Sequence, residues 1–133
     1  MISEDIVVKS TKQSLETLRS RIQTLMPTML CHIGETVVHD ARQIHASFLK
    51  TPQDETLDLC ILLRLAGTQF IVTGDVVKGG SGEVLSELGP VVSSEQEEET
   101  EPFGQHTCRC ILDQEDTLIQ ALRSGTSTPL QAR

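Results

Sequence analysis

The 133-residue sequence predicts an α+β fold in which an N-terminal helical pair packs on a small antiparallel sheet, closed by a short C-terminal helix. Three observations carry this prediction. Apolar residues recur at helical spacing within residues 10–50, alternate with other residues from residue 57, and return to helical spacing after residue 113. The length is that of one domain, which we place at residues 1–123, followed by a disordered tail over 124–133.

The first predicted helix begins near Ser10, which with Gln13 fits a capping box. Four apolar residues then fall on one helical stripe: Leu15, Leu18, Ile22 and Leu25. Pro27 interrupts the stripe, because proline is tolerated at the first position of a helix but not in its interior. Either the helix ends near Leu25 and a second begins at Pro27, or one long helix kinks there.

The second predicted helix runs to Lys50 and ends at Thr51-Pro52. Its apolar stripe steps by three or four residues through Leu30, Ile33, Val37, Ala41, Ile44 and Phe48. Three histidines accompany the stripe, namely His32, His39 and His45, and no two of them have the four-residue spacing of a helical metal-binding pair. We interpret them as solvated side chains.

The sheet is expected within residues 56–112, and its clearest strand covers residues 57–65, where Leu and Ile alternate with other residues. Gly67-Thr68 suits a tight hairpin turn, and Gln69 to Val77 supplies the next strand, with a bulge or early turn at Gly74-Asp75.

The remainder of the predicted sheet is less regular. Gly79 to Gly82 has the composition of a flexible or engineered linker. Glu83 to Leu88 fits a strand or one helical turn that stops at Gly89-Pro90. Gln105 to Leu112 is predicted as a further strand. The last helix is expected over residues 113–123, capped by Asp113, with three apolar residues on its inner face: Leu118, Ile119 and Leu122.

Composition limits the classes of partner. The net charge is −8, and residues 51–133 alone carry −9, so the phosphate backbone of a nucleic acid would be repelled. No apolar run is long enough for a membrane span, and no secretory signal precedes the first helix. Four cysteines at this low density indicate reduced thiols, so we expect a cytoplasmic protein with no nucleic-acid or membrane partner.

An acidic segment follows the predicted strands. Between Gly79 and Thr107 the sequence has seven Glu and neither Lys nor Arg. Five of these are candidates for docking a basic protein partner: Glu95, Glu97, Glu98, Glu99 and Glu101. The alternative is a solvated, mobile loop whose charges repel one another.

One cluster of side chains has metal-binding character. His106, Cys108 and Cys110 alternate along the predicted strand, which places them on one side of it, and these soft or borderline ligands make zinc a candidate cofactor. Residues two apart on a strand are separated by roughly 6–7 Å, which is too far for adjacent tetrahedral ligands unless the backbone bends. The alternative is that these cysteines are buried thiols in the core.

No catalytic motif accompanies these residues: the sequence lacks a nucleophile elbow and a phosphate-binding loop, so we do not expect an enzyme. The favoured function is a small acidic adaptor, chaperone or regulatory subunit that binds protein as a homodimer. Its interface is predicted on the two helical stripes, at Leu18, Ile22, Val37 and Ile44. A metal-binding or thiol redox-sensing protein is the alternative, and a small-molecule-binding domain is the third possibility.

Overall fold

A computed structural model describes residues 4–50, 55–92 and 103–124 of the chain. Within these residues, one helix precedes five consecutive strands, and two short helices follow them. The elements are α1 (Glu4–Leu25), β1 (Met29–Val38), β2 (Ala41–Lys50), β3 (Glu55–Ala66), β4 (Gln69–Lys78), β5 (Val84–Val92), α3 (Phe103–Leu112) and α4 (Glu115–Ser124).

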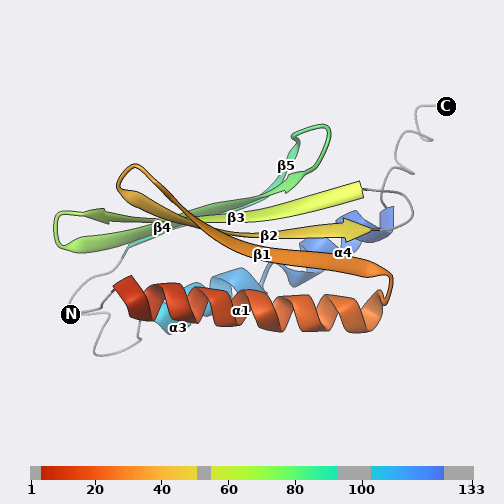
Figure 1. Cartoon of the computed structure of the whole chain (residues 1–133), viewed down its shortest axis with the longest axis horizontal. Helices are drawn as coiled ribbons and strands as arrows, with labels where there is room; N and C mark the ends of the chain where they lie inside the picture. Colours follow the sequence, from red (N-terminus) through yellow and green to blue (C-terminus); the bar gives the residue numbers. More distant parts are fainter. Residues whose placement is uncertain (1–3, 51–54, 93–102, 125–133) are drawn as a thin grey trace.

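The five strands form one antiparallel sheet in the order β1-β2-β3-β4-β5, so each strand pairs with its neighbour in sequence. The described helices α1, α3 and α4 lie on one face of this sheet, with α1 running beneath β1 and β2 (Figure 1). The predicted α+β class is therefore confirmed, and the C-terminal helix is present, but the N-terminal helical part consists of α1 alone.

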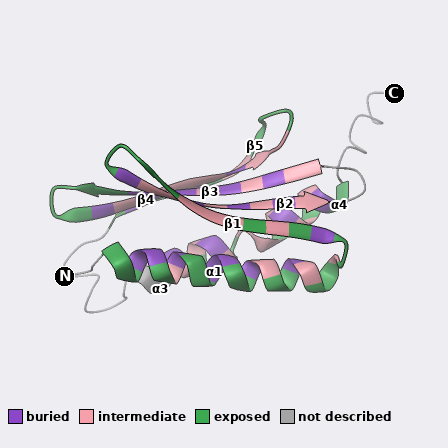
Figure 2. Cartoon of the chain, viewed as in Figure 1, coloured by how far each residue is buried: buried purple, intermediate pink, exposed green. Residues whose placement is uncertain are grey.

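The core lies between the sheet and the helices. On α1, Val7, Leu15, Leu18 and Ile22 are 0% exposed, and Figure 2 shows the buried residues on the side of this helix that faces the sheet. Alternate residues of the strands meet them, among them Ile44, Ala46, Phe48, Leu57, Leu59, Ile61, Leu63, Val72 and Val76. With only three Phe in the chain, this core is almost entirely aliphatic.

The predicted second helix is wrong: residues 29–50 form the β1–β2 hairpin. The same residues also satisfy a period of two, because Met29, Cys31 and Ile33 on β1 alternate with more exposed neighbours. On β2 the fully buried residues are Ile44, Ala46 and Phe48, which share one strand face. Burial of that face on α1 decides between the two periods, and the sheet consequently begins at Met29 and ends at Val92.

The hairpin turns at His39-Asp40, between the paired residues Val38 and Ala41. His39 has a φ of 57°, while Asp40 does not share the positive value. The β3–β4 turn has the same form, with Gly67 at a φ of 67° as its first central residue. A positive φ at this position alone is typical of type II′ hairpin turns. The Gly67-Thr68 turn was predicted from sequence, and the His39-Asp40 turn was not.

The predicted strands over residues 57–65 and 69–77 are confirmed as β3 and β4. The bulge or early turn expected at Gly74-Asp75 is absent, because Gly74 and Asp75 pair regularly with Ile61 and Cys60. The register shift between Val72 and Gly74 comes from an extra residue in β5, at Gly89-Pro90. Residues 83–88 fit either a strand or a helical turn from sequence, and the structure shows the strand β5. The predicted stop at Gly89-Pro90 is wrong, because the pairing with β4 continues to Val92. The Gly79–Gly82 stretch is an ordered turn, in which Gly79 donates its N–H to the carbonyl of Thr56 at 2.7 Å.

Residues 105–112 were predicted as a strand, and this is wrong because Phe103–Leu112 is the helix α3. Its buried residues Thr107 and Ile111 are four apart and therefore lie on one helical face. The final helix is confirmed as α4, with Leu118 and Leu122 buried and Ile119 packed partly against the core. The predicted cap at Asp113 is wrong, because α4 begins at Glu115 and the carbonyl of Gln114 accepts the N–H of Leu118. The predicted cap at Ser10 is wrong, because α1 begins at Glu4 and Ser10 lies within it.

Among the described residues, no helix is both long and apolar enough to cross a membrane. The predicted acidic docking residues Glu95, Glu97, Glu98, Glu99 and Glu101 lie outside the described residues, as does the predicted tail beyond Ser124.

Candidate functional site

The sheet face turned away from the helices, called the open face below, carries polar residues along its middle. The strand register places His45 opposite Cys60, Cys60 opposite Asp75, and Asp75 opposite Glu87. Gly34 on β1 completes this row opposite His45. Directly opposed residues of antiparallel strands have Cβ atoms about 4.5–5.5 Å apart, so the row brings a base, a thiol and two carboxyl groups side by side.

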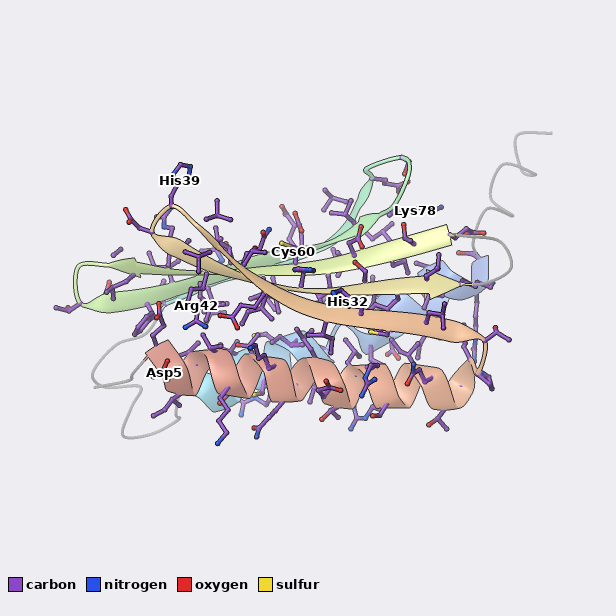
Figure 3. The ribbon with its side chains drawn as sticks, in the orientation of Figure 1. Asp5, His32, His39, Arg42, Cys60 and Lys78 are labelled. Carbon is purple, nitrogen blue, oxygen red and sulfur yellow. The ribbon has the colours of Figure 1, made fainter. Side chains whose placement is uncertain are left out.

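The neighbouring row adds His32, Ser47 and Asp58. The Ser47 hydroxyl donates to Oδ1 of Asp58 at 2.7 Å, and the Gln43 amide donates to Sγ of Cys60 at 2.7 Å. These bonds cross from β2 to β3 and fix the polar side chains in place. Figure 3 shows the sheet with His32 labelled on β1 and Cys60 on β3.

His32 and His45 converge over Gly34. Their ring centroids are 6.2 Å apart, with ring planes inclined by 49°. A Cβ atom built on Gly34 would lie 2.7 Å from Nε2 of His45 and 3.4 Å from Nε2 of His32. Glycine at this position therefore leaves the space that both imidazoles approach, and both Nε2 atoms lie within 3.4 Å of one position.

Burial favours the neutral form of two thiols, Cys60 and Cys110, by raising the pKa of each. Burial raises the pKa of Cys60, the hydrogen bond from Gln43 opposes this, and the negative charges of Asp75 and Asp58 add to it. Burial also raises the pKa of Cys110, with Asp113 adding to this effect and Arg109 opposing it. Because the thiolate is the reactive species, these cysteines are poor nucleophiles near neutral pH.

A second feature of functional interest is the outer edge of β1. All ten residues of β1 pair with β2 in one unbroken register, and the strand contains neither a proline nor a bulge. Three apolar side chains on it are exposed: Leu30 at 57%, Val37 at 73% and Val38 at 42%. The strand therefore presents a long, regular edge whose outward N–H and C=O groups have no partner strand within the described sheet.

The opposite edge is built differently. The pairing of β5 with β4 shifts register twice, and β5 contains Gly89, with a φ of 82°, followed by Pro90. Bulges and proline on an edge strand prevent another strand from pairing with it. The β5 edge thus carries bulges and a proline, and the β1 edge carries neither.

Charged side chains fasten the β1–β2 hairpin to α1. Arg42 on β2 forms an ion pair with Glu35 on β1, and it also approaches Glu4 of α1 at 3.4 Å. Lys12 of α1 reaches the same Glu35 at 2.5 Å. Glu35 is only 18% exposed, so two cations neutralise a largely covered carboxylate. This network ties the β1–β2 hairpin to the N-terminal half of α1.

The structure does not bring the predicted metal cluster together. His106, Cys108 and Cys110 lie on α3, where residues two apart point to different sides of a helix. Cys108 donates from its thiol to the carbonyl of Ser10 at 3.3 Å, and His106 contacts Arg109. Within residues 4–50, 55–92 and 103–124, no three His, Cys, Asp or Glu side chains are arranged to hold one metal ion.

The predicted interface residues also lie apart. Leu18, Ile22 and Ile44 are 0% exposed inside a single copy of the chain, whereas Val37 is exposed on β1. The homodimer itself stays a prediction, but the first three side chains have no accessible surface to offer a second copy of this fold.

No family model, curated protein or solved structure matches the chain. The function therefore has to be argued from the site itself. Sequence reasoning missed both the histidine pair and the β1 edge, because each depends on recognising residues 29–50 as a hairpin. The signal that would have revealed them is the alternation of Met29, Cys31 and Ile33 in a segment containing Gly34.

Proposed function

We propose that this chain is a non-catalytic protein-binding domain, a small acidic adaptor, chaperone or regulatory subunit, that acts as a homodimer through the edge of β1. The single observation that carries the proposal is the asymmetry between the two sheet edges. β5 has two register shifts and a proline, whereas β1 is regular, long and bordered by exposed apolar side chains.

Strand addition is the mode of binding that such an edge supports. An added strand satisfies the outward N–H and C=O groups of β1, and its side chains pack beside those of the edge strand. Unprotected regular edges are a liability in soluble proteins, which normally interrupt them with lysine, proline or bulges. Retaining ten uninterrupted residues at one edge while interrupting the other favours a binding role for the first.

A second copy of the chain is the partner we propose for this edge. Two β1 strands related by a two-fold axis would pair antiparallel and extend the sheet across both copies, which is an isologous interface. The exposed Val37 and Val38 near one end of β1 would then approach the exposed Leu30 near the other end of the partner's strand. The proposed compartment is the cytoplasm, supported by four free thiols.

Sedimentation velocity on matched edge variants tests the proposal. Val37→Lys places a charge on the β1 edge, where lysine opposes strand pairing. Val84→Lys makes the same change on β5, where the side chain is 51% exposed. We expect the natural chain and Val84→Lys to sediment as dimers at tens of micromolar. We expect Val37→Lys to sediment as a folded monomer whose melting temperature is lower than that of the dimer, because the stabilisation from association is lost.

Two results would contradict this function. A natural chain that sediments only as a monomer at this concentration would remove the homodimer. Loss of the dimer in Val84→Lys with retention in Val37→Lys would assign assembly to the wrong edge. Because both side chains are exposed, neither substitution should unfold the chain, and circular dichroism of each variant checks that it is folded.

A further inference from the structure

We propose that His32 and His45 form a binding site for a divalent transition-metal ion on the open face of the sheet. The residues come from adjacent strands and are fixed by the β1–β2 register, in which His45 faces Gly34 and His32 faces Ser47. The site does not use the backbone edge of β1, so metal binding can be tested separately from the proposed homodimer.

Geometry carries the first part of the argument. With zinc–nitrogen bonds of about 2.0–2.1 Å, two imidazoles that share one ion place their ring centroids about 5–6 Å apart. The observed centroid distance of 6.2 Å is slightly longer than this range. Both Nε2 atoms lie within 3.4 Å of the position that a Cβ on residue 34 would occupy, so we infer that rotation of the rings lets the two nitrogens share an ion near this position.

The backbone supplies the second part. Only glycine at position 34 leaves room for this convergence, because a Cβ would stand 2.7 Å from both Cε1 and Nε2 of His45. His45 is half-buried and His32 is exposed, so one ring lies partly within the sheet surface and the other borders the solvent. An ion bound here remains accessible, and water completes its coordination.

Charge and ligand chemistry supply the third part. Imidazole nitrogen is a preferred ligand of Cu²⁺, Zn²⁺ and Ni²⁺, and among these the order of affinities favours Cu²⁺. Asp58, Asp75 and Glu87 lie on the same face in the two rows that contain the histidines. Their carboxylates create a negative potential that attracts a cation to this part of the surface. The imidazole ligands of this face therefore favour a borderline metal ion, and its carboxylates favour a positively charged one.

Calorimetric titration of the untagged chain with ZnCl₂, and separately with CuCl₂, tests the proposal. We expect His32→Ala and His45→Ala each to weaken binding by more than about tenfold, since loss of even a supporting residue commonly costs 10–100-fold in metal affinity. His39→Asn is the matched control, because His39 lies at the hairpin tip (Figure 3) and asparagine tolerates its φ of 57°. This control should bind as the natural chain does.

A fourth variant separates geometry from ligand identity. Gly34→Ala keeps both histidines but places a methyl group where the rings converge, and the atom it meets is the movable end of His45. We expect it to remain folded and to bind metal more weakly. The proposal is overturned if the natural chain binds neither ion, if His32→Ala binds as tightly as the natural chain, or if Gly34→Ala leaves the affinity unchanged.

Discussion

Lys50 donates a hydrogen bond from Nζ to the carbonyl oxygen of Leu122 at 2.6 Å, joining the last residue of β2 to the last turn of α4. The final carbonyl groups of a helix have no partner within the helix and carry partial negative charge. A lysine from the sheet therefore satisfies one of them and complements the helix dipole. Two segments separated by 72 positions are connected by this bond, and it secures α4 against the sheet.

Replacing Lys50 by methionine should loosen this connection. Methionine keeps much of the apolar stem and removes the charged donor, so we expect a loss of about 1 kcal/mol in the free energy of unfolding. For a chain of this size, that corresponds to a melting temperature lower by about 3–6 °C. Lys9→Met, on the exposed side of α1, is the control and should change stability by less than about 0.5 kcal/mol. Equal destabilisation by both would argue against the role of the Lys50 contact.

The β3–β4 hairpin was predictable because two local signals agree there. Strict alternation from Leu57 to Leu65 is followed at once by Gly67-Thr68, whose glycine supplies the positive φ of the turn. Similar agreement made the C-terminal helix predictable, since Leu118 and Leu122 follow acidic residues that favour a helix start. Where the period and the terminal signal point to the same element, sequence reasoning succeeded.

Residues 29–50 were misassigned because two periods fit the same apolar residues. Ile33, Ile44 and Phe48 belong both to a helical stripe and to the buried face of the two strands. The turn that distinguishes these readings contains His39 at positive φ, a conformation that residues other than glycine seldom adopt. Packing of this hairpin on α1 selects the strand, and that contact is not visible from local sequence.

The candidate site was hidden by the same error. On a helix, His32 and His45 would be thirteen positions and several turns apart, whereas the hairpin brings them to one face with Gly34 between them. The opposite happened to His106, Cys108 and Cys110, which a strand would have placed on one side and which α3 separates. In each segment, the secondary structure decides whether the side chains lie on one face: the hairpin brings His32 and His45 together, and the helix α3 separates the other three.

Gly34 and Gly74 provide a matched pair for testing the sheet. A Cβ on either glycine would meet an atom at 2.7 Å, but at Gly34 that atom belongs to the His45 ring and at Gly74 it is the carbonyl oxygen of Cys60. A side chain can rotate away, whereas the backbone of the central strand β3 cannot move without disturbing its pairing. We expect Gly74→Ala to cost about 2–3 kcal/mol and Gly34→Ala less than about 1 kcal/mol. Denaturant unfolding of both variants measures the difference, and a reversed order would contradict this account.

The pH dependence of stability should report on Cys31. Burial raises the pKa of its thiol from 9.0 to about 11, while Arg19 opposes this and Glu16 adds to it. The stability contributed by the protonated thiol is fully present below about pH 9, where the unfolded chain also keeps its proton, and is lost as the pH rises through about 11. We expect Cys31→Ala to make the decline over this interval shallower. Denaturant midpoints measured across it give the slope, and an unaltered slope would mean that Cys31 is not a source of the decline.

Substitution of Ile22 by aspartate distinguishes a core position from an interface position. Ile22 is 0% exposed in one copy of the chain, so aspartate there places a carboxylate in the aliphatic core without a partner. Such a change commonly exceeds about 4 kcal/mol, which is a large part of the stability of a small domain, and we expect an unfolded chain. Leu25→Asp is the matched control on the same helix, because Leu25 is 50% exposed and should tolerate the charge. Circular dichroism and sedimentation of both variants measure folding and assembly. A folded, monomeric Ile22→Asp would indicate that Ile22 lies at a subunit interface and would contradict its place in the core.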